Sequence, residues 1–376
     1  MLKSRLMRAG ATASALAVLG LSACSSAGGD DSVKSAGDAA AKLQGSVAFN
    51  DPQLKELEGK ITDALKGKDL KDVRVAMVIN SPSAYWTEGQ KGMENAAKNL
   101  GVKAEFQAPA GGDLNQQLSI LDTLRSDKID GYTLSAVDPS AVKGPVNAAQ
   151  KAGISVVAID SPLAGTTDPT VYLGTPNTDA GQQAGTAMKT LLGGKGEVAI
   201  LTGSLTAANA VQRIAGFKKA VEGSGIKIVD TLNDDADPSK ALSNAQTALQ
   251  ANPNLKGIYT VWSYDGPAAG QAVKGAGKSG AVKIVADDAE PKTVEFVKSG
   301  VVQAMILQRP YQQGYMGVYL LTAMKVLGKD ATMKLVQPYL VDKDGASTLN
   351  SGIGLVTKAN LSQYLDDLAK LGVTAK

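Results

Sequence analysis

The chain has 376 residues, of which 44% are hydrophobic, 4% aromatic and 20% charged. At about 150 residues per domain this length leaves room for two core-bearing domains, and the ordinary apolar fraction excludes wholesale disorder. The sequence contains no histidine, which excludes histidine as a general base, as the partner of a serine or cysteine nucleophile and as a zinc ligand. The 39 basic residues exceed the 36 acidic ones only through Lys3, Arg5 and Arg8, and the balanced remainder argues against a nucleic-acid partner.

The N-terminus has the pattern of a bacterial targeting signal. Basic residues precede an uncharged run from Ala9 to Ala23, which has 15 residues, whereas a membrane-spanning helix needs roughly 20. The run ends in Leu21-Ser22-Ala23-Cys24, and Cys24 is the only cysteine. This ending resembles the lipobox of bacterial lipoproteins, so residues 1–23 are expected to be a lipoprotein signal peptide and Cys24 to carry the lipid. A plain secretory signal with an incidental cysteine is the alternative.

Residues 24–71 are expected to form a lipid-anchored tether, because residues 25–49 are rich in Ser, Gly, Ala and Asp. A short amphipathic helix is expected between Asp51 and Lys66. Its apolar positions are Leu54, Leu57, Ile61 and Leu65. The folded part of the protein would then lie outside the cytoplasm, attached to the cell membrane through the lipid on Cys24.

From Val73 onward, short apolar runs rich in Val and Ile alternate with helical patterns. Such continuously apolar strands, separated by helices, indicate parallel sheets that are covered on both faces. The expected strands are Val73–Ile79, Val102–Gln107, Gly131–Leu134, Ser155–Ile159, Glu197–Leu201, Lys227–Leu232, Gly257–Val261, Val282–Ala286 and Val302–Leu307. The expected helices are Thr87–Leu100, Asn115–Arg125, Ala141–Lys151, Asp179–Leu192, Val211–Val221, Pro238–Gln250, Pro267–Gly275 and Pro291–Lys298.

The alternation occurs twice, once before about residue 175 and once after it. The sequence therefore predicts an α/β fold of two Rossmann-like, doubly wound lobes with a cleft between them. In open α/β sheets, ligands bind beyond the carboxyl ends of the strands. The residues that directly follow each strand are consequently the candidate functional residues.

The strand ends carry carboxylates, amides, a guanidinium and large aromatic rings, but no nucleophile–base pair. These candidates are Tyr85, Trp86, Ser135, Asp160, Asn209, Arg213, Trp262, Asp288 and Gln308. The set suits a sugar or another polyol, because hydroxyl groups both donate and accept hydrogen bonds and an aromatic ring can cover the apolar face of a sugar. Asp287 is expected to be a solvated neighbour of Asp288.

Each candidate also has a purely structural explanation. Tyr85 and Trp86 would then form an apolar entry to the first helix, and Trp262 would fill space between the lobes. Asn209 would be a helix N-cap and Arg213 the partner of a surface acid. Both kinds of explanation stay open at the level of the sequence.

Seven stretches together resemble the type I periplasmic binding proteins, in particular the ribose-binding-protein-like sugar receptors of ABC importers. They are AYWTEGQKGMENAAKNLGV, LSAVDPSAV, VVAIDSP, YLGTPNTDAGQQAG, NAVQRIAGF, GKSGAVKIVADD and ILQRPYQQG. The resemblance covers about residues 72–340 and implies two lobes that are joined by a three-strand hinge and close around a monosaccharide. It implies a first lobe of residues 72–175 plus 309–338 and a second lobe of residues 176–308 plus 339–376.

The resemblance also assigns individual positions in this chain. The paired aromatic residues of the family fall on Tyr85 and Trp86, and the amide position before them falls on Ser83. The polar, acidic and basic positions of the family's sugar site fall on Ser135, Asp160, Arg213, Asp288 and the hinge residue Gln308. Trp262 is expected to take the place of an amide that the family carries near Tyr264. Ser161, Ala236 and Asp287 differ from the ribose receptors, which leaves another pentose, a hexose or a polyol open.

The expected function is that of a substrate-binding lipoprotein of an ABC importer. It would act as a monomer, without cofactor or metal, and would deliver a neutral monosaccharide or related polyol to a permease. A receptor for a quaternary amine, in a cage of Tyr85, Trp86 and Trp262, is a competing hypothesis that the charge of Arg213 disfavours. A receptor for a signalling furanose would use the same kind of site. A glycosidase with Asp160 and Asp288 as its carboxylates is the least favoured hypothesis.

Overall fold

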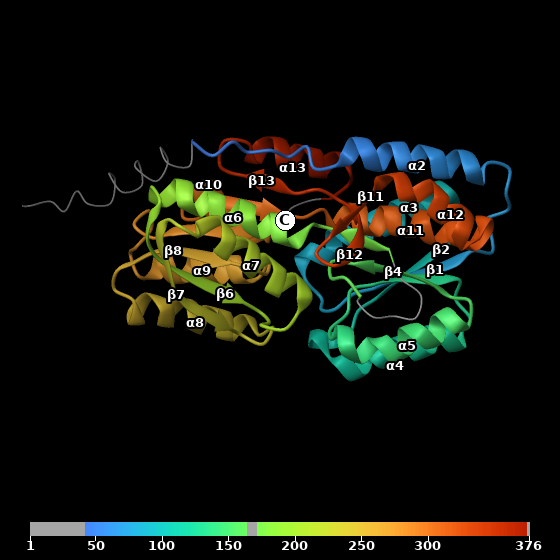
Figure 1. The fold of residues 1–376 in the computed structure, drawn as a ribbon, viewed down its shortest axis with the longest axis horizontal. Coiled ribbons are helices and arrows are strands. Elements are labelled where there is room, and N and C mark those ends of the chain that lie inside the picture. Colours follow the sequence, from blue (N-terminus) through green and yellow to red (C-terminus); the bar gives the residue numbers. More distant parts are fainter. Residues whose placement is uncertain (1–41, 164–170, 374–376) are drawn as a thin grey trace, which may run out of the picture.

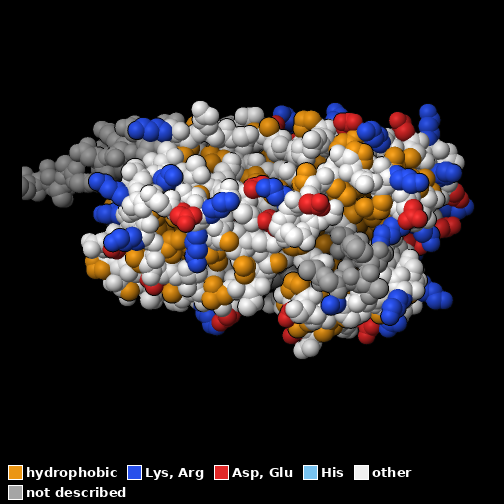
Figure 2. Space-filling view, in the orientation of Figure 1, with side chains coloured by type: hydrophobic (Ala, Val, Ile, Leu, Met, Phe, Trp, Pro, Cys, Tyr) orange, Lys and Arg blue, Asp and Glu red, His pale blue; other side chains and the backbone are white. Residues whose placement is uncertain are grey.

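The computed structural model describes residues 42–163 and 171–373, which form two α/β lobes side by side (Figure 1). The signal peptide of residues 1–23 and the lipidation site at Cys24 lie outside these described residues. Within them, no helix combines the length and the apolar content that crossing a membrane would require. On the face drawn in Figure 2, acidic and basic side chains are interspersed.

The first lobe is built on a sheet in the order β11-β12-β5-β4-β3-β1-β2. Its strands pair in parallel except for β11 and β12, which form an antiparallel hairpin. The strands are β1 (Arg74–Val78), β2 (Lys103–Gln107), β3 (Gly131–Leu134), β4 (Ser155–Ile159), β5 (Tyr172–Gly174), β11 (Leu340–Lys343) and β12 (Ala346–Asn350). The helices are α2 (Asp51–Leu65), α3 (Ala84–Leu100), α4 (Leu114–Ser126), α5 (Pro139–Lys151), α11 (Pro310–Leu327) and α12 (Lys329–Val336).

The second lobe has a sheet in the order β13-β10-β9-β8-β6-β7, in which only β13 runs antiparallel to its neighbour. The strands are β6 (Lys195–Thr202), β7 (Gly225–Asn233), β8 (Leu255–Thr260), β9 (Lys283–Asp287), β10 (Ala304–Leu307) and β13 (Gly354–Val356). The helices are α6 (Asn177–Leu192), α7 (Ala208–Val221), α8 (Pro238–Ala251), α9 (Asp265–Gly275), α10 (Pro291–Ser299) and α13 (Leu361–Lys370).

Strand β1 shows why the apolar runs form central strands. Successive side chains of a strand point to opposite faces of the sheet. Val75 and Met77 are buried in the cluster that includes α2, α3 and α11, whereas Ala76 and Val78 are buried in the cluster that includes α4 and α5. Both faces are therefore covered by helices, and the predicted doubly wound fold is confirmed.

Every strand and helix expected from the sequence is present, but β5, the strands β11 to β13 and the helices α11 to α13 were not expected. Helix α11 lies between other helices and the sheet, and 14 of its 18 residues are buried. Because it is apolar on all sides, it lacks the 3.6-residue stripe by which surface helices are recognised.

The expected domain ranges differ from the structure at both ends of the chain. In the tether of residues 24–71, α2 forms as expected, but its four apolar residues are buried in the core of the first lobe. Within the range 339–376, β13 and α13 lie in the second lobe, whereas β11 and β12 extend the first sheet, because β12 pairs with β5.

The lobes are joined by three connections, at residues 174–177, 307–310 and 350–354. The segment before α2 also passes between them, because Ser46 pairs with Leu355 of β13 while α2 belongs to the first lobe. Asn50 Nδ2 donates a hydrogen bond of 2.8 Å to the backbone oxygen of Asn350 at this crossing. Within the described residues the chain thus crosses between the lobes four times.

Candidate functional site

A cavity of about 400 Å³ lies between the lobes at the carboxyl ends of the central strands. Nine of the ten residues expected to bind a ligand line it, and the tenth, Ser135, does not. The lining residues are Asn80, Ser81, Pro82, Ser83, Tyr85, Trp86, Gly111, Asp160, Asn209, Arg213, Ala236, Pro238, Trp262, Ser263, Tyr264, Asp288, Glu290 and Gln308. The topology therefore brings together side chains that lie far apart in the sequence.

The aromatic pair at the start of α3 forms one wall. The rings of Tyr85 and Trp86 meet edge to face, with centroids 4.8 Å apart. The indole Nε1 of Trp86 donates to Asn80 Oδ1 at 2.8 Å, and Gln313 Nε2 donates to the hydroxyl of Tyr85 at 2.9 Å. Because the polar end of each ring is held by the protein, the ring surfaces remain available for an apolar face of a ligand.

Asp160 follows β4 and belongs to the first lobe. Its Oδ2 accepts hydrogen bonds from Ser135 Oγ at 2.9 Å and, across the cavity, from Asn209 Nδ2 at 3.4 Å. Burial raises the pKa of Asp160, while the charge of Arg213 and the bond from Ser135 act in the opposite direction. Ser135 thus holds the carboxylate in place instead of lining the cavity. Asn209 is not the N-cap of α7, because Ala207 occupies that position.

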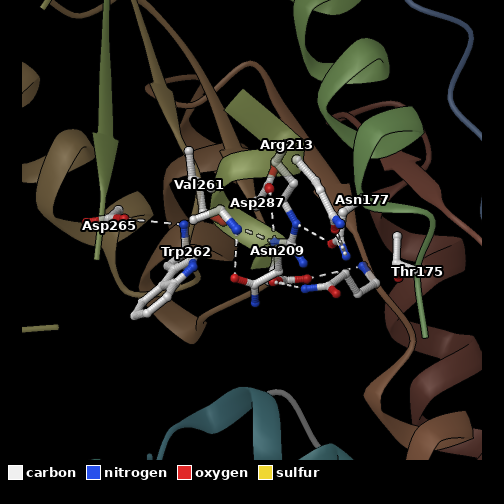
Figure 3. Close-up of polar contacts among 12 residues, drawn as sticks. Thr175, Asn177, Asn209, Arg213, Val261, Trp262, Asp265 and Asp287 are labelled. Atoms are coloured by element: carbon white, nitrogen blue, oxygen red, sulfur yellow. Dashed lines mark hydrogen bonds and ion pairs between the residues drawn. The ribbon is translucent and has the colours of Figure 1, made fainter. Parts of the chain in front are cut away.

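Arg213 on α7 is almost fully buried, with 1% of its surface exposed. Its Nε donates to Asn177 Oδ1 at 2.9 Å, and its Nη1 donates to the backbone oxygen of Val261 at 3.1 Å and to Asp287 Oδ2 at 3.2 Å (Figure 3). The remaining nitrogen, Nη2, is buried without a hydrogen-bond partner among the described residues. The guanidinium is therefore fixed on three sides, with donors left for a ligand.

The expectation that Asp287 is solvated is wrong. Its side chain is 1% exposed and forms the buried ion pair with Arg213, and the hydroxyl of Tyr259 donates to the same carboxylate oxygen at 3.1 Å. A carboxylate can be buried here because the guanidinium compensates its charge. Burial nevertheless raises the pKa of Asp287 well above its usual value, against the lowering effect of Arg213.

Asp288 and Gln308 stand together where the second sheet meets the hinge. Gln308 donates to Asp288 twice, from its backbone N at 3.1 Å and from Nε2 at 2.9 Å. Burial raises the pKa of Asp288, and the charge of Arg213 partly offsets this shift. The amide oxygen of Gln308 has no partner within the described part of the chain, so it can accept from a ligand hydroxyl.

Trp262 follows β8 and supplies an aromatic ring from the second lobe. Its ring meets that of Tyr264 at a centroid distance of 6.2 Å and an angle of 80°. The indole Nε1 is buried, and no described residue accepts a hydrogen bond from it. Trp262 therefore offers both a ring surface and a donor without a partner among the described residues.

Glu290 was missed by sequence reasoning. It lines the cavity, accepts from Ser263 Oγ at 2.9 Å and faces the backbone N–H of Tyr85 in the other lobe. It does not directly follow a strand, because Asp288 is the first residue after β9. The sequence signal for Glu290 is Pro291, which starts α10 and leaves Glu290 at the N-cap position, close to the strand end.

The donor set of the cavity consists of oxygen and nitrogen groups that suit hydrogen bonding. Among residues 42–163 and 171–373, no group of three or more Cys, Asp or Glu side chains could hold a metal ion. A ligand would have to accept hydrogen bonds from Arg213 and Trp262 and donate to Asp160, Asp288 and Gln308. A molecule with several hydroxyl groups meets both demands.

The fold agrees with comparisons to known proteins. The family model described as "Periplasmic binding protein domain" matches residues 75–330. The D-allose-binding periplasmic protein of Escherichia coli is 32% identical over 269 residues, which cover 68% of this chain and 84% of that protein. The D-ribose/D-allose-binding protein of Pseudomonas aeruginosa is 30% identical over 224 residues, which cover 57% of this chain and 68% of that protein.

Among solved structures, an ABC transporter solute-binding protein from Burkholderia graminis, in complex with D-arabinose, matches with a TM-score of 0.70. It shares 32% identity, and the match covers 79% of this chain and 99% of that chain. The family model spans more than half of the sequence, and the solved relative shares the two-lobed architecture. This chain therefore belongs to the periplasmic binding protein domain family and has its type I fold.

Proposed function

We propose that this chain is the extracytoplasmic substrate-binding lipoprotein of an ABC importer. It captures a neutral monosaccharide or a related polyol in the cavity between the lobes and delivers it to a permease. The lipid on Cys24 holds it at the cell membrane. The names of the relatives support this class of ligand, because they describe proteins that bind allose, ribose and arabinose.

The observation that carries the proposal is the set of unmatched polar atoms in the cavity. Arg213 Nη2, Trp262 Nε1 and Gln308 Oε1 are all buried without partners among the described residues. Leaving a buried polar group unsatisfied costs about 1–3 kcal/mol. Two donors and one acceptor, beside two carboxylates, are matched by a ligand whose hydroxyl groups can act in both ways.

The charge of the site favours a neutral ligand. Arg213 is neutralised by Asp287, so Asp160, Asp288 and Glu290 make the cavity acidic. An anionic sugar would be repelled by these carboxylates, whereas hydroxyl groups donate to them. A quaternary amine would match the acidity and the rings, but it would leave the free donors of Arg213 and Trp262 unsatisfied.

The ligand is expected to close the lobes, because the residues that line the cavity belong to both of them. Tyr85, Trp86 and Asp160 belong to the first lobe, whereas Arg213 and Trp262 belong to the second. A ligand that contacts both sets binds the closed state more tightly than the open state and so shifts the population toward closure. The closed form is then the one presented to the permease.

Isothermal titration calorimetry on the full chain in detergent tests the proposal. The ligands are D-allose, D-ribose, D-arabinose and xylitol, with galacturonate and choline as anionic and cationic comparisons. Binding of at least one neutral compound, with none of galacturonate, is the expected result. Tight binding of choline alone, or of galacturonate, would contradict it. Intact-mass spectrometry of the membrane fraction tests the lipid on Cys24, which an unmodified cysteine would disprove.

A further inference from the structure

A chain of hydrogen bonds runs behind the cavity and connects the backbone of Asp160 with the guanidinium of Arg213. Tyr172 on β5 donates from its hydroxyl to the backbone oxygen of Asp160 at 2.9 Å, or alternatively to that of Thr175 at 3.1 Å. Asn177 Nδ2 donates to the hydroxyl of Tyr172 at 3.3 Å. Arg213 Nε donates to Asn177 Oδ1 at 2.9 Å. The chain therefore begins at the backbone oxygen of Asp160 in the first lobe and ends at the guanidinium of Arg213 in the second.

Neither Tyr172 nor Asn177 lines the cavity. They are 2% and 0% exposed, so water does not compete for these hydrogen bonds. They also flank the first connection between the lobes: Tyr172 begins β5 and Asn177 begins α6. The hydrogen-bonded chain thus passes through the hinge and not across the cavity.

Close contact between α6 and α7 brings Arg213 to Asn177. A Cβ atom on Gly181 would lie 1.9 Å from the backbone oxygen of Arg213, and one on Gly216 would lie 2.1 Å from that of Thr178. Only glycine allows the two backbones to approach so closely. Asn177 is further held by Gln212, whose Oε1 accepts from Asn177 Nδ2 at 3.2 Å. The asparagine is consequently fixed by its own helix, by α7 and by the first sheet.

We propose that Tyr172 and Asn177 are positioning residues, which set the placement of Arg213 in the second lobe relative to Asp160 in the first. This inference rests on the proposed function, since it concerns how the same cavity is prepared for its ligand. Arg213 has three rotatable bonds beyond its Cβ atom, and ordering such a side chain costs up to about 2 kcal/mol. Asn177 holds the guanidinium in place before a ligand binds, so the free energy of binding does not include the cost of ordering it.

The first test needs no ligand. In side-chain ¹H–¹⁵N NMR spectra of the full chain in detergent, the Arg213 Nε–H should exchange slowly with solvent, since it is buried and bonded to Asn177. The Asn177→Ala variant should exchange this proton at least tenfold faster. Unchanged exchange in a folded Asn177→Ala variant would overturn the proposal, whatever the protein binds.

The second test measures affinity for D-allose and D-arabinose by calorimetry. Asn177→Ala is expected to weaken binding about tenfold, and Tyr172→Phe about three- to tenfold, because each substitution breaks the hydrogen-bonded chain that orders Arg213. Tyr132→Phe is the matched control: the Tyr132 hydroxyl is buried in the same sheet without a partner among the described residues and does not line the cavity. This variant should bind within twofold of the wild type.

A double-mutant cycle separates positioning from a general structural role. Arg213→Lys keeps a positive charge beside Asp287 but has no Nε–H to donate to Asn177. In this background Asn177→Ala should cost less than twofold in affinity. An equal loss in both backgrounds would show that Asn177 does not act through Arg213. If neither sugar binds the wild type, the proposed function fails for these ligands, while the exchange experiment still decides on positioning.

Discussion

Asp160 and Asp288 occupy equivalent places in the two lobes and share an unusual backbone conformation. Each is the first residue after a buried central strand, β4 or β9. Their φ angles are 60° and 62°, in the left-handed region that few residues other than glycine adopt, although aspartate tolerates it. The left-handed residue turns the chain sharply at the strand end. Both turns leave a buried carboxylate on the wall of one cavity.

The first prediction concerns the loss of one of these carboxylates. Asp288→Ala should weaken sugar binding about ten- to a hundredfold, because a hydrogen bond to a charged group contributes about 1.5–3 kcal/mol. Calorimetry with the sugar that binds the wild type most tightly measures the change. Asp235→Ala is the control, since Asp235 also has a left-handed φ of 57° but does not line the cavity. If Asp288→Ala bound the sugar with wild-type affinity, Asp288 would not contact the ligand.

The position of a residue relative to a strand could be read from the sequence, which is why Asp160, Trp262 and Asp288 were found. Runs of Val, Ile and Ala mark the buried strands, and the first residue beyond such a run lies at the carboxyl ends of the parallel strands, where ligands bind. What cannot be read is the partner of a buried charge. Asp287 looked like a surface acid, because its partner Arg213 comes from a helix 74 positions earlier in the chain.

Short and uniformly apolar elements escaped sequence reasoning for a related reason. Strand β5 has only three residues, too few to show a period, and it is a strand only because β4 and β12 flank it. Helix α11 is buried all round. Tyr172 and Asn177, which connect the two halves of the cavity, lie on β5 and at the start of α6. Their importance depends on contacts between the lobes that no local pattern encodes.

A second prediction follows from the space beneath Trp262. A Cβ atom at Gly203 would lie 2.1 Å from a ring carbon of Trp262 and 2.2 Å from the hydroxyl of Tyr264. Gly203→Ala should therefore displace the indole and weaken sugar binding about tenfold, since the ring can no longer cover the ligand. Calorimetry measures the affinity, and tryptophan emission reports the displaced ring.

Gly59→Ala on α2 is the matched substitution, because nothing lies within 4 Å of a Cβ at that position. It should leave affinity unchanged, and the loss of a helical glycine should stabilise the protein by roughly 0.5–1 kcal/mol. If Gly203→Ala bound sugar as tightly as Gly59→Ala does, Trp262 would not form part of the ligand-contacting wall.

The third prediction concerns the pH dependence of stability. Burial raises the pKa of Glu88 to about 7, against the lowering effects of the Arg309 charge and of the backbone N–H of Tyr311. The charge of Asp288 adds to the rise, and Glu88 in turn raises the pKa of Tyr364. The folded protein thus keeps a proton on Glu88 that the unfolded chain, with a pKa of about 4.3, releases.

Because the pKa of Glu88 is higher in the folded state, its protonation contributes to the free energy of unfolding. This contribution is fully present below about pH 4.3 and is lost as the pH rises through about 7. The difference between the two pKa values corresponds to roughly 3–4 kcal/mol. Urea unfolding of the wild type and of Glu88→Gln from pH 4 to 9 measures it. The wild type should lose stability relative to Glu88→Gln across this interval. Parallel curves for the two proteins would mean that Glu88 does not change its charge on folding.

The last prediction concerns the turn of the hairpin between β11 and β12. This hairpin belongs to the first sheet, yet Asp344 at its turn accepts hydrogen bonds from the backbone N of Thr178 on α6, at 3.1 Å, and from the hydroxyl of the same residue. Gln212 Nε2 on α7 donates to the backbone oxygen of Asp344 at 3.1 Å. Pro176, at the N-cap position of α6, gives no side-chain cap. The first lobe therefore caps a helix of the second.

Removing this cap should weaken the attachment between the lobes near the hinge. Asp344→Ala is expected to cost about 0.5–2 kcal/mol in the free energy of unfolding, the usual range for a lost N-cap. Small-angle X-ray scattering of the ligand-free protein should also show a larger radius of gyration, because more open conformers are populated. Asp342→Ala changes an exposed acid on the same hairpin and serves as the control. If both variants matched the wild type in stability and in scattering, the contact between Asp344 and α6 would not influence the equilibrium between open and closed lobes.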